Sequence, residues 1–440
     1  MRILTVGGSG REHAAVAALH RSGADIYAVT RNANPGILGL AKEYRIISDD
    51  NDVDAVCEFA IEHDVEYAFI GPESPLEAGL VDALENLGVS CAAPSAAAAR
   101  IETSKTFMRE LMARHGIEGN IEFASFSDAE AAAAYLRSMD REVAIKPVGL
   151  TGGKGVKIQG EHLNGLDESI AYVREIFRDN IGGGSVIFEE KLVGEEFTQM
   201  VFADGKRIVP MPLVQDHKRA FEDDTGPNTG GMGSYSDADH LLPFVAAEDR
   251  ASALAILQKI VDAMAAEGCP YRGPMYGQFM LTATGPKVIE INARFGDPEA
   301  MNVLPIMETD FASVIKWMVT GKYKEEVKFK NLATVCKYVV PEGYGVEPIT
   351  GKQLCVDEEA IRECGAEVFY ANVESKEGEL YTGKSRSVAV VGIAPTIEEA
   401  EARCENGLKH VKGESICVRK DIGKKHLIQR RIDHMKHLRS

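Results

Sequence analysis

The sequence has no cysteine pair with CxxC spacing. Its eight cysteines are scattered, at positions 57, 91, 269, 336, 355, 364, 404 and 417. Neither a zinc site nor a disulfide framework is therefore predicted, and a reduced cytoplasm is the expected location. No stretch approaches the roughly 18 apolar residues of a membrane span. The opening residues, MRILTVGGSG, lack signal-peptide architecture. We therefore expect no membrane partner.

Basic residues are outnumbered. The chain has 49 Lys and Arg against 67 Asp and Glu, which gives a net charge of −18. Such a surface repels phosphate backbones, so nucleic acid is not an expected partner. A phosphorylated small molecule must instead be held by local lysines, arginines and backbone N–H groups. At 440 residues the chain is too long for one ordinary core, and about two to four domains are expected.

Short apolar runs predict strands at Arg2–Val6, Ile26–Thr30 and Tyr67–Ile70. Helical stretches separate them, which indicates βα units and a parallel sheet. The rest mixes strands and helices, so the predicted fold class is α/β. The tail from Lys424 is basic and roughly amphipathic, with apolar residues at 427, 428, 432, 435 and 438. It predicts a packed or fraying surface helix.

Two glycine-rich turns are candidate phosphate sites. GGSGREHA (7–14) stands between a strand and a helix, where backbone N–H groups can approach an anion. A dinucleotide fingerprint would need glycine in place of His13, so an NAD site is not predicted. The loop GLTGGKG (149–155) follows Lys146 and suits closure over nucleotide phosphates. It is not a Walker A loop, because Gly155 follows Lys154.

The stretch VIEINARFGDPE (288–299) predicts a metal pair. In a strand Glu290 and Asn292 point to one face, and Ile289 and Ile291 to the other. A carboxylate and an amide oxygen suit Mg²⁺, which completes its shell with phosphate oxygens and water. Arg294, two residues on, is placed to neutralise a transferring phosphoryl group or to bind a carboxylate.

A polar segment lies near the middle of the chain. QDHKR (215–219) combines Asp216, Lys218 and Arg219, a mixed-charge cluster suited to a zwitterion such as an amino acid. His217 by itself is more often a structural residue. The glycine-rich stretch at 223–233 is predicted to be a surface loop or a substrate loop, and its length and polarity favour function.

Together these stretches resemble the phosphoribosylamine–glycine ligase family of the ATP-grasp superfamily. The resemblance runs to about residue 425. The matching segments, in the family's order, are GGSGREHA, GPESPL (71–76), SKTFM (104–108), GLTGGKGV (149–156), FEEKLVGEE (188–196), QDHKR, DTGPNTGGMGSYS (224–236), VIEINARFGDPE and RKDIG (419–423).

The resemblance implies a domain order and a reaction. A Rossmann-like domain (1–103) would precede an ATP-grasp region (104–327) with a lid lobe at about 120–192, a small α+β domain (328–425) and a basic tail (426–440). We expect a monomer. ATP would activate the glycine carboxylate as glycyl phosphate, which the amine of 5-phosphoribosylamine attacks. The product is N1-(5-phosphoribosyl)glycinamide, in purine biosynthesis.

Residue roles also follow from the resemblance. It assigns ATP binding to Lys105, Lys146, Gly152, Gly153, Lys154, Glu189, Glu190, Leu192 and Glu196. Of these, Glu189, Glu190 and Leu192 are on the adenine side and Glu196 is at the ribose. It assigns phosphoribosylamine and glycine to Gly8, Ser9, Gly10, Glu73, Asp216, Lys218 and Arg294. Glu290 and Asn292 would hold Mg²⁺ or Mn²⁺, and the catalytic residues would be Arg294, Lys154 and Asp216.

The chain departs from the family pattern in two places. Lys146–Pro147–Val148–Gly149 replaces the usual Lys–Ala–Asp–Gly, which removes a carboxylate, and the basic tail is longer than expected. Three alternatives are open. One is an ATP-grasp ligase with another carboxylate and amine. Another is an NAD-dependent dehydrogenase, which His13 disfavours. The third is a non-catalytic nucleotide-binding regulator, disfavoured because Glu290, Asn292, Lys146 and Lys154 are all present.

Overall fold

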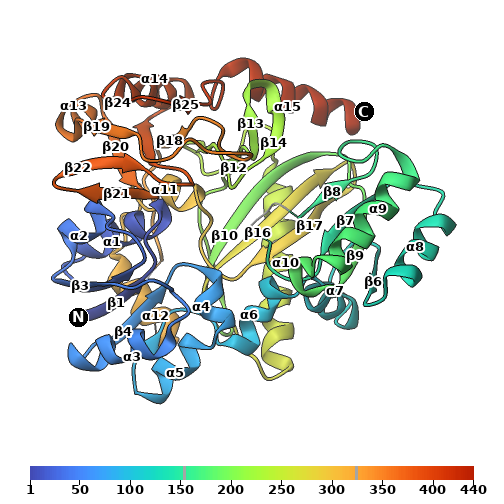
Figure 1. The fold of residues 1–440 in the computed structure, drawn as a ribbon, viewed down its shortest axis with the longest axis horizontal. Coiled ribbons are helices and arrows are strands. Elements are labelled where there is room, and N and C mark those ends of the chain that lie inside the picture. The colour runs from blue at the N-terminus through green and yellow to red at the C-terminus, as the bar shows by residue number, and fades with distance from the viewer. Residues whose placement is uncertain (152–154, 323–325) are drawn as a thin grey trace.

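The computed structural model describes residues 1–151, 155–322 and 326–440 (Figure 1). The predicted ATP residues Gly152, Gly153 and Lys154 lie outside the described residues. No helix in the described part of the chain is long and apolar enough to cross a membrane.

The first hundred residues form a parallel sheet with the strand order β3-β2-β1-β4-β5. Its central strands are almost wholly buried, because helices cover a parallel sheet on both faces. The predicted strands Arg2–Val6 and Tyr67–Ile70 are confirmed. The elements are β1 (Arg2–Val6), α1 (Gly10–Arg21), β2 (Asp25–Thr30), α2 (Pro35–Leu40), β3 (Glu43–Ile46), α3 (Val53–Glu62), β4 (Tyr67–Ile70), α4 (Glu73–Glu77), α5 (Leu80–Asn86) and β5 (Ser90–Cys91).

Two helices, α6 (Ala96–Thr103) and α7 (Lys105–Arg114), lead to a lobe with its own antiparallel sheet, ordered β6-β9-β7-β8. Its core is separate from the main core and includes Val143, Tyr172 and Phe188. The lobe therefore packs as a unit of its own. Its elements are β6 (Phe123–Phe126), α8 (Ala129–Ser138), β7 (Val143–Pro147), β8 (Lys157–Ile158), α9 (Gly165–Arg178), η1 (Ile181–Gly183) and β9 (Val186–Glu190).

The next sheet, β11-β10-β16-β17, is antiparallel and carries the predicted metal pair. Glu290 pairs with Gln278 and Asn292 with Tyr276, so both predicted ligands share one face. The predicted strict alternation is wrong at Ile289, because a register shift leaves this residue outside the pairing. The elements are β10 (Glu195–Asp204), β11 (Ile208–Pro210), α10 (Ala247–Ala266), β16 (Arg272–Thr282), β17 (Gly285–Asn292), α11 (Glu299–Val303) and α12 (Phe311–Thr320).

The last sheet is shared between distant segments. Its order is β12-β15-β18-β23-β20, with β25 also beside β18. The glycine-rich stretch predicted as a loop is thus partly strand, in a short hairpin and in β15. The elements from the middle of the chain are β12 (Gln215–Asp216), β13 (Arg219–Phe221), η2 (Glu222–Asp224), β14 (Thr225–Asn228) and β15 (Gly233–Ser236).

The C-terminal part contributes the remaining strands of this sheet and a small second sheet, β21-β22-β19-β24. It also contains three helices, the last of which confirms the predicted packed tail. Its elements are β18 (Ala333–Pro341), β19 (Gln353–Val356), α13 (Glu358–Glu363), β20 (Ala366–Tyr370), β21 (Val373–Lys376), β22 (Glu379–Thr382), β23 (Val388–Ala394), α14 (Ile397–Leu408), β24 (Val411–Gly413), β25 (Ile416–Val418) and α15 (Lys425–Leu438).

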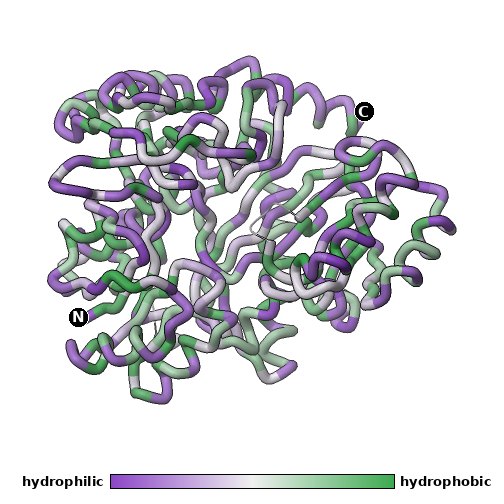
Figure 2. Tube along the Cα trace, viewed as in Figure 1, coloured by the Kyte–Doolittle hydropathy of each residue, from purple (hydrophilic) through white to green (hydrophobic). Residues whose placement is uncertain are grey.

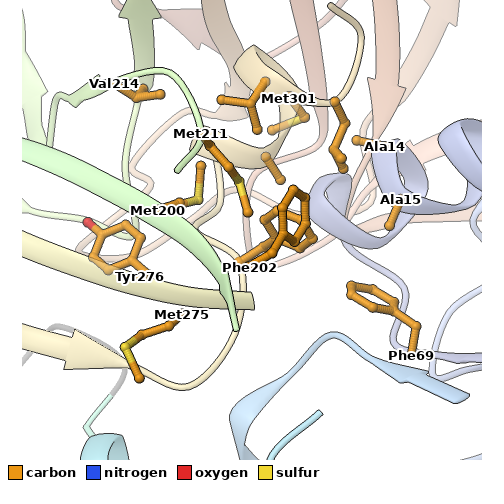
Figure 3. Packing of buried hydrophobic residues seen from close by; sticks show 14 of the residues in the cluster. Ala14, Ala15, Phe69, Met200, Phe202, Met211, Val214, Met275, Tyr276 and Met301 are labelled. Carbon is orange, nitrogen blue, oxygen red and sulfur yellow. The ribbon is translucent and has the colours of Figure 1, made fainter. Parts of the chain in front are cut away.

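One apolar cluster joins the N-terminal, central and C-terminal parts. Figure 3 shows Phe69 of β4 and Phe202 of β10 converging from opposite sides. The ring of Phe295 lies 6.0 Å from that of Phe69 and 5.9 Å from that of Phe202. This cluster holds the RFGDPE turn, which contains Arg294, against both sheets. In Figure 2 the tail α15 is mostly hydrophilic, although Leu427 and Met435 are buried.

Candidate functional site

Glu290 and Asn292 lie side by side on β17, where Asn292 Nδ2 donates to Glu290 Oε1 at 3.3 Å. Burial alone would raise the pKa of Glu290, but the charges of Lys218, Lys146 and Lys105 bring this pKa below its usual value. Three lysines from separate elements therefore surround one carboxylate. Such a group can hold a divalent cation together with anionic oxygens of a ligand.

Lys146, Glu189 and Arg109 form a buried ionic group that we call the lid-side triad. Lys146 Nζ is 2.6 Å from Glu189 Oε2, and Arg109 Nε is 2.7 Å from Glu189 Oε1. Burial would raise the pKa of Glu189, but the charges of Arg109 and Lys146 lower it to about 2. The Glu189 side chain thus positions Lys146 between two strands.

Arg109 also connects the two lobes. Its Nη2 donates to the carbonyls of Val288 and Ile289, each at 2.9 Å, at the irregularity of β17 next to Glu290. Arg109 of α7 thereby fixes the strand that carries Glu290 and Asn292 relative to Glu189 and Lys146.

Lys105 begins α7 and faces the start of the predicted glycine loop. Its Nζ donates to Gly149 O at 3.0 Å. The pKa of Lys105 is lowered, mainly by burial, and the charge of Lys146 acts in the same direction. Two lysines at one edge of the loop raise the local positive potential, as a phosphate site requires.

Glu196, on β10, accepts hydrogen bonds from Gln278 Nε2 at 2.7 Å and from Lys218 Nζ at 3.2 Å. Glu190 ends β9, and Leu192 lies in the connection between the lobes. Both are half-buried. The predicted adenine and ribose residues therefore follow one another along the path from β9 to β10.

The half-buried Asp216 and the buried Glu299 are close enough for the charge of Glu299 to act on Asp216, and we call them the glycine-side pair. Burial and the charge of Glu299 raise the pKa of Asp216 well above its ordinary value, despite the charges of Lys218 and Arg386. The pKa of Glu299 is also raised, mainly by burial. Two neighbouring carboxyls whose nearby cations do not offset these effects suit a cationic ligand such as an ammonium group.

Of the other QDHKR residues, Lys218 joins this region and Arg219 does not. Burial would lower the pKa of Lys218, but the charges of Glu196, Glu290 and Asp216 raise it. Arg219 Nη1 instead donates to Gly226 O at 2.8 Å, within the β13–β14 hairpin. His217 is buried, and burial together with the charge of Arg419 lowers its pKa to about 3. It is therefore uncharged, but neither of its ring nitrogens has a hydrogen-bond partner among the described residues, so it is not the hydrogen-bonded structural histidine that was expected.

Arg294 is held between two carboxylates. Its Nε is 3.3 Å from Glu73 Oε2 and its Nη2 is 2.9 Å from Glu102 Oε1. Burial would lower the pKa of Arg294, but the charges of Glu102 and Glu73 raise it. Glu102 also accepts from Ala293 N at 2.6 Å. Burial raises the pKa of Glu102 to about 7, even though Arg294 opposes this effect.

The first glycine turn is packed too closely for side chains. A Cβ on Gly8 would lie 2.1 Å from Asn32 Oδ1, and one on Gly10 would lie 2.4 Å from the Tyr338 hydroxyl. Ser9 N donates to Glu12 Oε2 at 2.7 Å, so Glu12 caps the helix that follows. The Ser9 N–H of this turn thus already has a carboxylate partner.

His13, the residue that disfavours an NAD site, contacts the C-terminal part of the chain. Its Nδ1 accepts from Tyr370 N at 2.9 Å, and burial lowers its pKa to about 4. A Cβ on Gly36 would lie 1.9 Å from the ring. The position that would hold the third glycine of a dinucleotide fingerprint therefore joins the N-terminal sheet to the C-terminal part.

Several residues in this region were not predicted from the sequence. Arg386 Nη1 donates to Gly230 O at 2.6 Å and to Asp297 O at 2.7 Å, tying the glycine-rich segment to the RFGDPE turn. Asp297 and Glu299 lie within a motif that sequence reasoning did single out, and Arg109 follows SKTFM. The residues missed are Glu102, Arg109, Asp297, Glu299 and Arg386.

The donor set fits a cation that shares its ligands with a substrate. Among the described residues, no three His, Cys, Asp or Glu side chains gather as a metal site. Glu290 and Asn292 offer two oxygens, with lysines nearby for phosphate. This is the pattern of Mg²⁺ held by one or two protein groups plus phosphates.

Comparisons with known proteins cover almost the whole chain. Its residues match the phosphoribosylglycinamide synthetase N domain over 1–102, the ATP-grasp (A) domain over 103–300 and the C domain over 334–425. The phosphoribosylamine–glycine ligase of Methanoregula boonei is 54% identical over 441 residues, and that of Methanothermobacter thermautotrophicus is 50% identical. Each alignment covers 100% of both chains. The crystal structure of phosphoribosylamine–glycine ligase from Thermotoga maritima superposes with a TM-score of 0.81 at 26% identity, covering 96% of this chain and 100% of that one.

Proposed function

This chain belongs to the phosphoribosylamine–glycine ligase family, and we infer that its reaction takes place among the residues around Glu290, Lys218 and Arg294. It is an ATP-dependent ligase of purine biosynthesis with an ATP-grasp fold. It joins glycine to 5-phosphoribosylamine and forms N1-(5-phosphoribosyl)glycinamide. The observation that carries the placement is Glu290, a carboxylate beside Asn292 with three lysines around it.

ATP is proposed to lie between the lid lobe and β10. Lys105 and Lys146 contact phosphates, Glu190 and Leu192 border the adenine, and Glu196 binds the ribose. The lid-side triad supports this placement, because Glu189 keeps Lys146 in one position. The residues Gly152, Gly153 and Lys154 are proposed to close over the phosphates.

Glu290 and Asn292 are proposed to hold Mg²⁺, with Mn²⁺ as the alternative metal. The bound cation would neutralise phosphate charge during transfer. Lys105, Lys146 and Lys218 are placed to stabilise the same charge from the protein side. This part of the site acts by positioning and electrostatics, which are the main contributions in phosphoryl transfer.

Glycine is proposed to bind between Asp216 and Arg294. The ammonium group supplies the counter-charge that the glycine-side pair lacks, and Arg294 faces the carboxylate that receives the phosphoryl group. Glu73 and Glu102 orient Arg294 through the pairs described above. Gly8, Ser9 and Gly10, with Glu73, receive the phosphoribosylamine. Its amine then attacks the glycyl phosphate and phosphate leaves.

The domain division proposed is 1–103, 104–327 with the lid lobe at about 120–192, 328–425 and the tail 426–440. We further propose a monomer in the cytoplasm. The lid lobe has a separate apolar core, which supports the proposal that it moves as a unit. Its closure would exclude water from the acyl phosphate.

The function is tested by measuring ADP release with Mg-ATP, glycine and freshly made 5-phosphoribosylamine, omitting each in turn. Release that requires all three, with glycinamide ribonucleotide detected by mass, is expected. If Mg-ATP binds tightly but ADP forms without glycine or the amine, the substrate assignment is contradicted. The proposed nucleotide site would still be supported by the binding.

A further inference from the structure

The C-terminal helix α15 bridges two segments that border the proposed nucleotide site. It lies beyond residue 425, where the match to the family's C domain ends. In Figure 1 it runs from the C-terminal part past the β13–β14 hairpin, and it packs against β10 and β16. Sequence reasoning assigned this tail no purpose. It buries Leu427 and Met435 and also forms ion pairs with charged residues of the central lobe.

Arg431 lies at the centre of these contacts. Its Nε is 3.2 Å from Glu195 Oε2, and its other end pairs with Asp224. His434 Nδ1 lies 2.6 Å from Glu195 Oε1. The side chains of Arg431 and Glu195 are 17% and 8% exposed, so water screens their pairing only weakly. One guanidinium thus joins two carboxylates from separate segments.

Glu195 is the first residue of β10 and directly precedes Glu196. Successive side chains of a strand point to opposite faces, so α15 holds Glu195 from the face away from Glu196. On the other face Glu196 is fixed by Gln278 and Lys218. The first two residues of β10, which follow the connection between the lobes, are therefore held by contacts on both faces of the strand.

Asp224 provides the second attachment. Burial would raise its pKa, but the charge of Arg431 and the hydrogen bond and charge of Arg419 leave the pKa strongly lowered. Arg419 Nη2 is 2.8 Å from Asp224 Oδ1, and Arg419 Nη1 donates to Arg219 O at 3.0 Å. Arg419 precedes α15, but Arg430 of α15 also pairs with Asp224 at 2.6 Å, so Arg430 and Arg431 together tie the hairpin that follows Lys218 to this helix.

We propose that α15 is a clasp for the ribose side of the nucleotide site, and that Arg431 is its positioning residue. Arg431 acts through Glu195 and Asp224 and does not touch the nucleotide. The clasp holds Glu196 and Lys218 at the distance needed to receive the sugar. The proposal rests on the proposed ribose role of Glu196.

The test compares Arg431→Met with Arg439→Met. Arg439 is in the same tail and forms a two-bond pair with Asp249 at 2.8 and 2.9 Å, away from Glu195. Both variants lose one positive charge of the tail; Arg431→Met loses the pairs with Glu195 and Asp224, and Arg439→Met loses the pair with Asp249. Calorimetric titration with a non-hydrolysable Mg-ATP analogue should show about tenfold weaker binding in Arg431→Met and little change in Arg439→Met.

Steady-state kinetics give an independent readout. Arg431→Met should raise KM for ATP about tenfold with kcat within about twofold, because ground-state binding is lost and the reacting groups are intact. Arg431→Lys should recover part of the affinity, since a lysine can pair with one carboxylate at a time. If Arg431→Met does not fold, the nucleotide affinities of Arg431→Lys and Glu195→Gln are compared with that of Arg439→Met instead.

Unchanged nucleotide affinity in a folded Arg431→Met would overturn the proposal. Equal losses in Arg431→Met and Arg439→Met would also overturn it, because they would indicate general docking of the tail. The binding measurement needs neither glycine nor the amine. A failure of the ligase assignment would therefore appear in the ADP assay and leave the clasp result interpretable.

Discussion

The lid-side triad and the glycine-side pair both contain acidic side chains that are buried or half-buried, yet they differ in how the charge of these side chains is balanced. Glu189 has two cations within 2.7 Å, and its pKa falls to about 2. Asp216 and Glu299 are two carboxyls whose pKa values are raised by burial. The charge of Glu189 in the triad is balanced without a ligand, whereas a cationic ligand would balance the charge of the pair. If ATP and glycine bind as proposed, the ATP side is preorganised by the protein and the glycine side is completed by its substrate.

The largest expected effect lies between these two groups, at Glu290. Glu290→Ala should lower kcat by about 10²- to 10³-fold, because it removes a metal ligand and leaves three lysines without their shared carboxylate. Single-turnover ADP formation measures this loss. Near-normal kinetics in the variant would refute the metal assignment. Glu85→Ala, at a surface carboxylate far from the site, is the matched control and should behave as the unmodified protein.

Breaking the triad should appear as lost stability. Arg109 is fully buried and Glu189 is its partner, so Arg109→Met leaves a buried carboxylate with one cation. The free energy of unfolding should fall by about 3–5 kcal/mol, the usual cost of removing one partner of a buried pair. Chemical denaturation measures it. Arg174→Met, which breaks an exposed pair with Glu130, should cost less than about 1 kcal/mol.

Breaking the glycine-side pair should have the opposite signature. Asp216→Asn removes a half-buried carboxyl whose ionised form is disfavoured, so the folded protein should lose little stability. The KM for glycine should rise about 30-fold, in line with a lost contact to a charged group of about 2 kcal/mol. Nucleotide affinity, measured by titration, should stay unchanged. Parallel losses for ATP and glycine would show that the two sides are not separable.

The smallest expected effect concerns pH and Glu102. Its pKa is raised from the ordinary 4.5 to about 7, so in this range the folded protein binds more protons there than the unfolded chain does. Glu102 therefore lowers stability as pH rises from about 5 to 7, and the effect then levels off. Glu102→Gln cannot titrate, so its stability relative to the unmodified protein should increase over that range. Denaturant titrations at several pH values test this, and a constant difference would contradict it.

The sequence predicted the strands with strong apolar patterns and the residues inside recognisable motifs. The bounds of Arg2–Val6 and Tyr67–Ile70 were predicted correctly, because each strand is a short apolar run that can be recognised from neighbouring residues alone. Glu290 and Asn292 share a face because strand geometry requires it. The irregularity at Ile289 was missed, since it depends on the partner strand β16.

The residues that sequence reasoning missed act through partners far away in the chain. Glu102 meets Arg294, and Arg109 meets Glu189 and the carbonyl of Val288. Nothing near Glu102 in the sequence distinguishes it from a helical surface glutamate. Its role exists only once α6 is packed beside β17. Local patterns identify chemical groups, and tertiary packing decides which of them meet.

The sheet shared by β15 and β18 has a consequence for synthesis on the ribosome. Strand β15 pairs with β12 and β18, and β18 is made only after the whole of β16 and β17. Until then β15 presents an unpaired edge, which is a site for wrong pairing with other chains. A nascent chain stopped before residue 333 would therefore be prone to aggregate. The central lobe should not be obtainable as a stable fragment without the C-terminal part.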